Sequence, residues 1–164
     1  MRLSFAVLLM AGAVSLAACS SDDDMASATQ PETSYTPAAP AQPTYGSLEE
    51  ELKAQVGDRV FFDFDSSVLR PDARQTTEAF AAWLQARPQV VTTIEGHADE
   101  RGTRAYNLAL GERRANSVKR YLTTLGVNAG RVSTVSFGEE RPAVTGSTEY
   151  AWALNRRAVF QVAN

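Results

Sequence analysis

Hydrophobic and polar positions alternate with two different periods in the carboxy-terminal part of the chain. A period of two is expected for a strand with one buried face, and a period near 3.6 for a helix. Residues 59–65 show the first period, with Val60, Phe62 and Phe64 on one face. This pattern predicts a strand whose buried face includes all three side chains.

The segments that follow keep to the same two periods. Some have apolar positions at helical spacing and a polar cap, proline or glycine at the ends, and these predict helices at residues 47–57, 71–87 and 104–125. Others are short and rich in β-branched residues, and these predict strands at residues 90–96, 131–137 and 157–162. Residues 138–155 are expected to be mostly loop, with a helical turn near residues 150–154.

This order of elements predicts the fold class. Strands separated by helices favour parallel pairing through right-handed crossovers, whereas the last two strands need a different connection. The predicted fold is therefore α/β (α+β), a small mixed β-sheet with helices packed on it. We expect one such domain, because 164 residues with 44% hydrophobic side chains supply one compact core.

Charge is distributed unevenly along the chain. Residues 1–45 contain one basic and four acidic side chains, which leaves 15 basic and 15 acidic side chains in residues 46–164. A balanced domain offers no broad positive field, and this argues against a nucleic-acid binder. One cysteine can neither pair within the chain nor cluster, so a disulfide scaffold and a zinc ribbon are excluded.

The amino terminus resembles a secretory signal peptide. Arg2 is followed by an apolar run, residues 5–14, about half as long as a transmembrane helix. The run ends in small residues before Cys19, which resembles a bacterial lipobox, where the cysteine is lipidated and begins the mature protein. Ser20 follows, as in lipoproteins sorted to the outer membrane. An ordinary export signal with an incidental cysteine is the alternative.

The segment after Cys19 is rich in Ser, Ala, Thr and Pro and has almost no large aliphatic side chain. It buries too little apolar surface to offset its ordering entropy, so we expect a disordered tether. Fully stretched, it spans on the order of 90 Å. The predicted boundaries are residues 1–18 for the signal peptide, 19–45 for the lipidated cysteine and tether, and 46–164 for the folded domain.

The predicted long helix carries two stripes of residues three or four positions apart. The apolar stripe is expected to face the core and consists of Leu108, Gly111, Ala115, Val118, Leu122 and Leu125. The second stripe lies to one side and consists of Thr103, Asn107, Leu110 and Arg114. From the helix alone, a solvated boundary and a binding surface are both open interpretations of the second stripe.

A loop of mixed charge, residues 97–102, lies between a predicted strand and this helix. Open α/β sheets tend to bind ligands at this kind of position. If Asp99 faces Arg114 across a gap, the pair matches a zwitterion, with the carboxylate taking an ammonium group and the guanidinium a carboxylate. If the two side chains touch, they form a structural salt bridge. The residue types leave both interpretations open.

Other candidate sites find less support. His97 is the only histidine and has no cysteine beside it, so neither a metal site nor a cofactor is expected. Nothing in the loop marks an activated nucleophile, which argues against an enzyme. The run Asn155-Arg156-Arg157 is open to two interpretations, a structural or solvated strand edge and a ligand contact. Trp83 and Trp152 are expected to be aromatics of the core or of its edge.

Four blocks of sequence, in order, closely resemble the outer-membrane-protein-A carboxy-terminal-like (OmpA-like) family and its lipoprotein members. The blocks are residues 94–103, 106–118, 138–142 and 155–159. The resemblance covers roughly residues 58–162, and the lipobox and tether suit the same family. It implies a βαβαββ arrangement and an OmpA-like peptidoglycan-binding domain over residues 46–164.

The resemblance also implies a function. Such lipoproteins are anchored in the outer membrane with the domain in the periplasm, bind peptidoglycan through the diaminopimelate of the stem peptide, and work with TolB and other Tol proteins in envelope integrity and cell division. The implied ligand residues are the charged pair Asp99 and Arg114, with Phe64, Asp65, Arg101, Thr103, Asn107 and Leu110 around them. A wall-modifying hydrolase with acidic residues at 97–101 is the alternative hypothesis.

Overall fold

The computed structural model describes residues 47–163, so the predicted signal peptide and the whole of the predicted segment 19–45, with Cys19 and the tether, lie outside the described residues. In chain order the elements are α1 (Leu48–Gln55), β1 (Arg59–Phe61), α2 (Pro71–Gln85), β2 (Val91–His97), α3 (Arg104–Thr124), the 3-10 turn η1 (Ala129–Arg131), β3 (Val132–Gly138), α4 (Glu149–Asn155) and β4 (Arg157–Ala163). No helix within this described range is long and apolar enough to cross a membrane.

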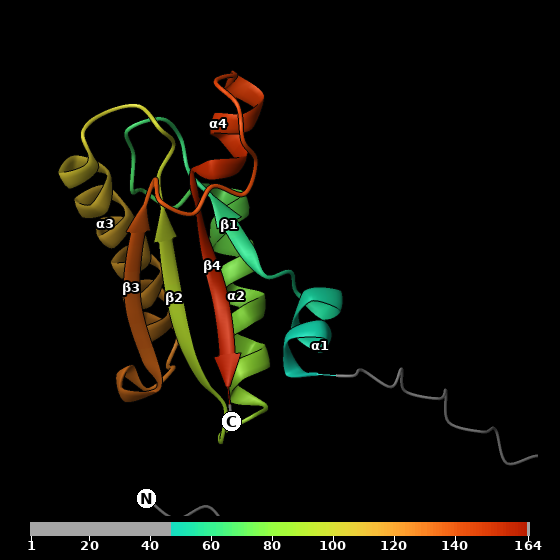
Figure 1. Ribbon diagram of the computed structural model, residues 1–164. Coiled ribbons are helices and arrows are strands. Elements are labelled where there is room, and N and C mark those ends of the chain that lie inside the picture. Colours follow the sequence, from blue (N-terminus) through green and yellow to red (C-terminus); the bar gives the residue numbers. More distant parts are fainter. Residues whose placement is uncertain (1–46, 164) are drawn as a thin grey trace, which may run out of the picture. The chain divides into compact units, whose positions relative to one another are not determined.

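The four strands form one mixed sheet in the order β1-β4-β2-β3 (Figure 1). The strands β2 and β3 are parallel and are joined through α3, whereas β4 runs antiparallel to both β1 and β2. The last strand of the chain is therefore inserted between the first two. This arrangement confirms the predicted fold class of a small mixed sheet with helices packed on it.

The core lies between the sheet and the two long helices, which Figure 1 shows on the same side of the strands. At its centre, the ring of Phe80 on α2 stacks on Phe160 of β4 with 4.2 Å between centroids. The predicted apolar stripe of α3 faces this core, since Ala115, Val118 and Leu122 are fully buried. Burial of these side chains is the main force that holds α3 against the sheet.

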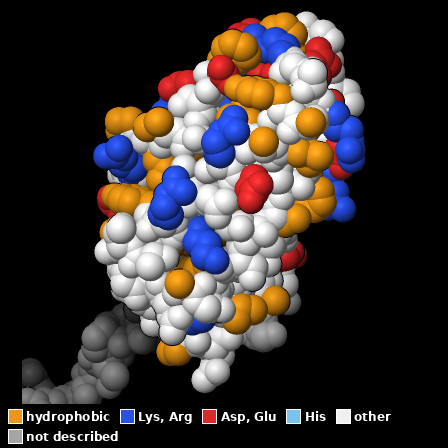
Figure 2. Space-filling model, turned by 90° about the vertical axis from the view of Figure 1, so that its left-hand side faces the viewer, with side chains coloured by type: hydrophobic (Ala, Val, Ile, Leu, Met, Phe, Trp, Pro, Cys, Tyr) orange, Lys and Arg blue, Asp and Glu red, His pale blue; other side chains and the backbone are white. Residues whose placement is uncertain are grey.

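The other side of α3 is polar and faces solvent. Its exposed residues include Arg104, Glu112, Arg113 and Arg120. Figure 2 views the domain from the left of Figure 1, and the basic side chains there stand apart, with acidic, apolar and uncharged surface between them. This face therefore carries no continuous positive field of the kind that a polyphosphate backbone requires.

Two glycines bring α3 unusually close to β2. A Cβ atom built on Gly96 of β2 would lie 1.8 Å from the carbonyl oxygen of Gly111 on α3. A hydroxyl of β3 also ties the helix to the sheet, because Ser136 Oγ donates to the Leu108 carbonyl at 2.7 Å. The approach sets the position of the next helical turn, which carries Arg114.

The first strand is shorter than predicted. It ends at Phe61, and the main chain turns after Phe62, with Asp65 in the left-handed region at φ 53°. As a result Phe64 is 59% exposed instead of buried, so its predicted place on the inner face is wrong. The regular pairing with β4 ends at Phe61, and one further main-chain bond follows, from Phe62 N–H to the carbonyl of Arg156 just before β4, at 2.9 Å.

His97 closes β2 with its ring buried and is 1% exposed. The ring stacks on Phe137 with centroids 5.6 Å apart, and neither ring nitrogen has a hydrogen-bond partner among the described residues. Burial, reinforced by the positive charges of Arg157, Arg141 and Arg59, lowers the pKa of His97 to about 3. The imidazole is therefore neutral at neutral pH.

This burial predicts a loss of stability in acid. In the unfolded chain the His97 pKa returns to 6.5, so between that pH and about 3 the unfolded chain binds more protons. The free energy of unfolding therefore falls as pH drops through this window, by an amount on the order of a few kcal/mol. Urea denaturation at pH 7 and pH 4 should show a smaller fall for His97→Gln than for the unaltered protein. Equal falls would contradict the assignment.

Candidate functional site

A pocket of about 220 Å³ opens between the loop after β1, the loop after β2 and the first half of α3. It is lined by Phe64, Asp65, Asp99, Arg101, Gly102, Tyr106, Leu110 and Arg114. Six of the eight residues implied by the family resemblance thus come together in one place, although they belong to three separate segments. The charged pair singled out from the sequence lies in this pocket.

Arg114 is fully buried and is held by main-chain oxygens. Its Nε donates to the Ser66 carbonyl at 2.8 Å, while Nη1 donates to the His97 carbonyl at 2.8 Å and Nη2 to the Asp63 carbonyl at 3.1 Å. A guanidinium has five N–H groups, so one on each terminal nitrogen stays available for an anion. Burial lowers the pKa of Arg114 to about 10, which leaves it charged at neutral pH.

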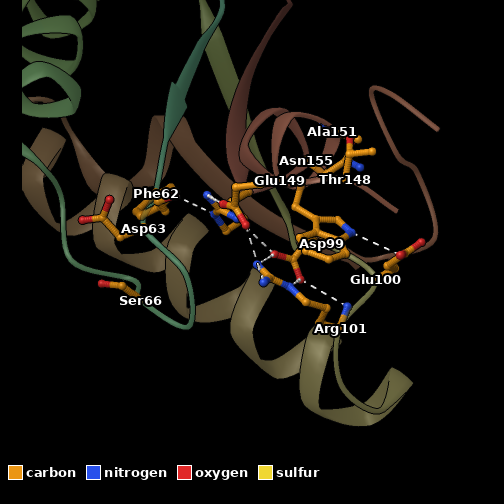
Figure 3. A network of polar contacts seen from close by, with 12 residues as sticks. Phe62, Asp63, Ser66, Asp99, Glu100, Arg101, Thr148, Glu149, Ala151 and Asn155 are labelled. Carbon is orange, nitrogen blue, oxygen red and sulfur yellow. Dashed lines mark hydrogen bonds and ion pairs between the residues drawn. The ribbon is translucent and has the colours of Figure 1, made fainter. Parts of the chain in front are cut away.

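Asp99 is 5% exposed, and both of its oxygens are occupied (Figure 3). Oδ1 accepts from the Arg101 main-chain N–H at 3.1 Å and from its Nε at 3.3 Å. Oδ2 accepts from Arg101 Nη2 at 2.7 Å and Arg156 Nη1 at 3.3 Å. Burial alone would raise the pKa of Asp99, but these hydrogen bonds outweigh it and hold the pKa below its usual value. Asp99 is therefore ionised at neutral pH.

Asp99 and Arg114 do not pair with each other. Over residues 47–163 no ion pair within 4.0 Å joins their side chains, although both line the same pocket. The direct salt bridge that the sequence left open is therefore absent. Each charge is instead fixed by other partners, Arg114 by carbonyl groups and Asp99 by arginines, so the scaffold keeps the opposite charges apart.

Arg101 lies over the acidic end of the pocket between two aromatic rings. The centre of its guanidinium is 4.0 Å from the Phe64 ring centroid and 4.1 Å from that of Trp152. Trp152 also donates from Nε1 to Glu100 at 3.1 Å. The prediction of a core or core-edge aromatic is confirmed for Trp83, which is 4% exposed. Trp152 is half-buried and lies at the rim of the site.

Tyr106 and Gly102 line the pocket, and reasoning from the sequence missed both. The Tyr106 hydroxyl donates to Asp65 Oδ1, linking α3 to the loop after β1. This bond is the main reason that the pKa of Tyr106 is raised. Tyr106 precedes Asn107 by one position and so falls off the helical stripe. Its place in the block 106–118 was the only signal that pointed to it.

The other two implied ligand residues, Thr103 and Asn107, do not line the pocket. Thr103 caps α3, because its Oγ1 accepts from the Tyr106 main-chain N–H at 3.2 Å. Asn107 is 1% exposed and donates from Nδ2 to Glu139, which ties the loop after β3 to the helix. Neither residue lines the pocket, so in this geometry both act on its shape.

The run Asn155-Arg156-Arg157 is buried, with its residues 5%, 7% and 7% exposed, which fits the structural interpretation of this strand edge and not the solvated one. Asn155 Oδ1 accepts from the main-chain N–H groups of Ala143 and Val144 at 2.8 and 3.1 Å. Arg157 donates to the Arg141 carbonyl at 3.0 Å. Arg156 instead reaches the site through Asp99, a contact between segments far apart in the chain that no local pattern indicated.

Comparison with known proteins shows the family of the chain. The model of the OmpA family matches residues 61–156. A peptidoglycan-associated lipoprotein of Brucella melitensis is 53% identical over 110 residues, which are 67% of this chain and 66% of that protein. Proteins of the same name from Agrobacterium fabrum and Pasteurella multocida are 44% and 45% identical, cover 94% of this chain, and are themselves covered to 85% and 95%.

Solved structures agree as well. The crystal structure of the peptidoglycan-associated lipoprotein from Burkholderia pseudomallei superposes with a TM-score of 0.61 at 43% identity, over 63% of this chain and 90% of that one. The carboxy-terminal domain of Helicobacter pylori MotB has a TM-score of 0.61 at 22% identity, over 65% of this chain and 84% of that one, and shares the fold. The chain therefore belongs to the OmpA family, among its peptidoglycan-associated lipoproteins.

Proposed function

We propose that this protein binds peptidoglycan non-covalently and tethers the outer membrane to the cell wall. The observation that carries the proposal is the pair of buried, ionised groups, Asp99 and Arg114, held apart in one pocket. The scaffold holds each charge with other partners, Arg114 with carbonyl groups and Asp99 with arginines, so the pocket presents one fixed positive and one fixed negative group, which suits a dipolar guest. Membership among peptidoglycan-associated lipoproteins supports peptidoglycan as the source of that guest.

The ligand group we propose is the free end of the stem-peptide diaminopimelate, which carries an ammonium and a carboxylate on one carbon. Arg114 has one available N–H on each terminal nitrogen and so suits a bidentate carboxylate. Asp99 suits the ammonium group. Because both Asp99 oxygens already accept hydrogen bonds, the ammonium must replace the Arg101 side chain, which is 30% exposed on the pocket side. Leu110 and Phe64 supply the apolar walls.

The acids of the 97–101 loop are poorly suited to serve as the general acid of a hydrolase. Asp99 is held ionised by arginines, and hydrogen bonds from Ser147 and Trp152 lower the pKa of Glu100. A general acid at neutral pH needs the opposite, a raised pKa. These pKa directions favour a binding role without turnover over the alternative of a wall-modifying hydrolase.

The proposal extends to the whole chain. Lipidation at Cys19 would anchor the protein in the outer membrane, with the domain in the periplasm, because several acyl chains give nearly permanent anchoring. Partnership with TolB and the other Tol proteins, in envelope integrity and cell division, completes the proposal. Family membership and the lipobox-like sequence before Cys19 support these assignments.

Sedimentation with purified sacculi tests the proposed function. The full-length protein in detergent is mixed with diaminopimelate-type sacculi, and both the pellet and the released material are measured. Retention in the pellet without soluble muropeptides is the expected result. Release of soluble fragments would require the hydrolase, and protein that stays in the supernatant would contradict wall binding.

Stem peptides that lack the terminal carboxylate should bind less well. Lysine-type stems and amidated diaminopimelate keep the ammonium group but remove the partner of Arg114. A charge-assisted hydrogen bond is worth about 1.5–3 kcal/mol, so we expect affinity at least about tenfold lower. Competition between matched muropeptides for the immobilised protein measures the difference. Equal affinity for both kinds of stem would contradict the role of Arg114.

A further inference from the structure

We propose that Arg156 is a positioning residue of the site, which fixes the carboxylate of Asp99 from behind and leaves its pocket side to the ligand. The inference rests on the proposed function, because it concerns the same site. Arg156 is the middle residue of the Asn155-Arg156-Arg157 run that precedes β4. It does not line the pocket, so it would act through Asp99 and not by touching the ligand.

The Arg156 side chain is 9% exposed and joins three parts of the fold. Its Nε donates to the Phe62 carbonyl after β1 at 3.1 Å, Nη1 to Asp99 Oδ2 at 3.3 Å, and Nη2 to Glu149 of α4 at 2.9 Å. Figure 3 shows Phe62, Asp99 and Glu149 converging on this point. A guanidinium held at each of its nitrogens has little freedom to move, and so the Asp99 oxygen that it holds is fixed as well.

The two arginines on Asp99 differ in whether a ligand can replace them. Arg101 approaches from the pocket side, and its side chain is 30% exposed. Arg156 approaches from the interior, where a ligand in the pocket has no access. When an ammonium group takes the place of Arg101, Arg156 is the remaining side chain that donates to Asp99. It therefore keeps the carboxylate oriented in the bound state.

Removal of Arg156 should also change the pKa of Asp99. The charged groups around Asp99 are Arg101 and Glu100 on its own loop, Arg114 on α3, Arg156 after α4, and Glu149 of α4, which pairs with both Arg156 and Arg101. The positively charged Arg156, which donates a hydrogen bond to Asp99, stabilises the ionised carboxylate, so loss of Arg156 raises the pKa of Asp99. With Arg156 replaced, Asp99 should become protonated at a higher pH, and ligand binding should be lost at a higher pH on acidification.

Arg157 provides a matched control. It is the next residue, is equally buried at 7% exposed, and donates to the carbonyl groups of Asn155 and Arg141. No hydrogen bond or ion pair joins it to Asp99 within the described part of the chain. A role of buried arginines in general stability would therefore affect both positions, whereas a role in positioning Asp99 belongs to Arg156.

The experiment compares Arg156→Gln with Arg157→Gln in the full-length protein. Carboxyl NMR titration gives the Asp99 pKa without ligand, and sedimentation with diaminopimelate-type sacculi gives binding. We expect Arg156→Gln to raise the Asp99 pKa and to weaken binding about tenfold, and Arg157→Gln to leave the Asp99 pKa unchanged. Arg156→Lys keeps the positive charge, so its Asp99 pKa and its binding should both lie between those of Arg156→Gln and those of the unaltered protein. If Arg156→Gln does not fold, Arg156→Lys takes its place in the comparison, and we expect a smaller rise in the Asp99 pKa.

An unchanged Asp99 pKa in the folded Arg156 variant would overturn the proposal. So would an equal loss of binding in the Arg156 and Arg157 variants. Failure of the proposed function looks different, because the unaltered protein would then not sediment with sacculi at all. The titration would still decide whether Arg156 controls Asp99.

Discussion

Gly96→Ala is expected to lower the free energy of unfolding by at least about 3 kcal/mol, or to prevent folding. The new Cβ atom would lie 1.8 Å from the carbonyl oxygen of Gly111, and that oxygen belongs to the backbone of α3. Neither β2 in the middle of the sheet nor the helix can yield locally, so α3 would have to move away from the sheet. Because α3 carries Leu110 and Arg114, the pocket would lose its shape with the core.

Urea denaturation of the full-length protein followed by circular dichroism measures this loss. Gly130→Ala is the control, because the atom nearest to its added Cβ is Asn128 Oδ1 at 3.2 Å, the end of a side chain that can move. The free energy of unfolding of Gly130→Ala should be within about 1 kcal/mol of that of the unaltered protein. If Gly96→Ala is as stable as Gly130→Ala, the close contact between β2 and α3 does not set the distance of the helix from the sheet.

Local patterns predicted most elements of this fold, because periodicity reports which side of an element is buried. The apolar stripe of α3 is the clearest case: Ala115, Val118 and Leu122 are fully buried as their spacing predicted. The insertion of β4 between β1 and β2 carried no such signal. Strand order depends on which edges meet after the helices pack, and a short strand has the same sequence pattern at any place in a sheet.

The end of β1 shows where period-two reasoning fails. Phe62 and Phe64 continue the alternation equally well, yet Phe62 is 1% exposed and Phe64 is 59% exposed. The difference comes from the turn that the Ser66 N–H closes on the Asp63 carbonyl at 3.3 Å, with Asp65 in the left-handed region, a conformation that aspartate tolerates but that its presence does not predict. The turn moves Phe64 out of the core and places it against Arg101. What the pattern assigned to the core thus became a wall of the pocket.

The two charged residues of the candidate site could be predicted from the sequence, but the groups that hold them in place could not. Asp99 and Arg114 stood out because a strand-to-helix loop and a helical stripe converge on one place. The partners of these charges lie far away in the sequence: Arg156 for Asp99, and the Ser66 and Asp63 carbonyls for Arg114. Main-chain acceptors have no sequence signature, so no reading of residue types would have found them.

Asp99→Asn and Arg114→Ala are each expected to weaken muropeptide binding by about 30-fold or more, since each leaves one charge of the ligand unmatched, at a cost of about 2–5 kcal/mol. Asp99→Asn keeps the shape of the side chain. Arg114→Ala also leaves the Ser66, His97 and Asp63 carbonyls without their donor. Its stability should therefore fall, and its binding must be measured at a temperature where circular dichroism shows it folded. Isothermal titration with a diaminopimelate-containing muropeptide measures both affinities.

Asp63→Asn separates a specific clamp from a general effect of negative charge near the pocket. Asp63 lies in the same loop as Phe64 and Asp65, but its side chain is 69% exposed and pairs with Arg70 at 3.4 Å, outside the pocket. Its affinity should stay within about twofold of the unaltered protein, because exposed pairs contribute little. If Asp63→Asn weakens binding as much as Asp99→Asn, the total negative charge near the pocket governs binding, and not a specific contact with Asp99. If neither Asp99→Asn nor Arg114→Ala changes the affinity while both remain folded, separated charges do not grip the ligand.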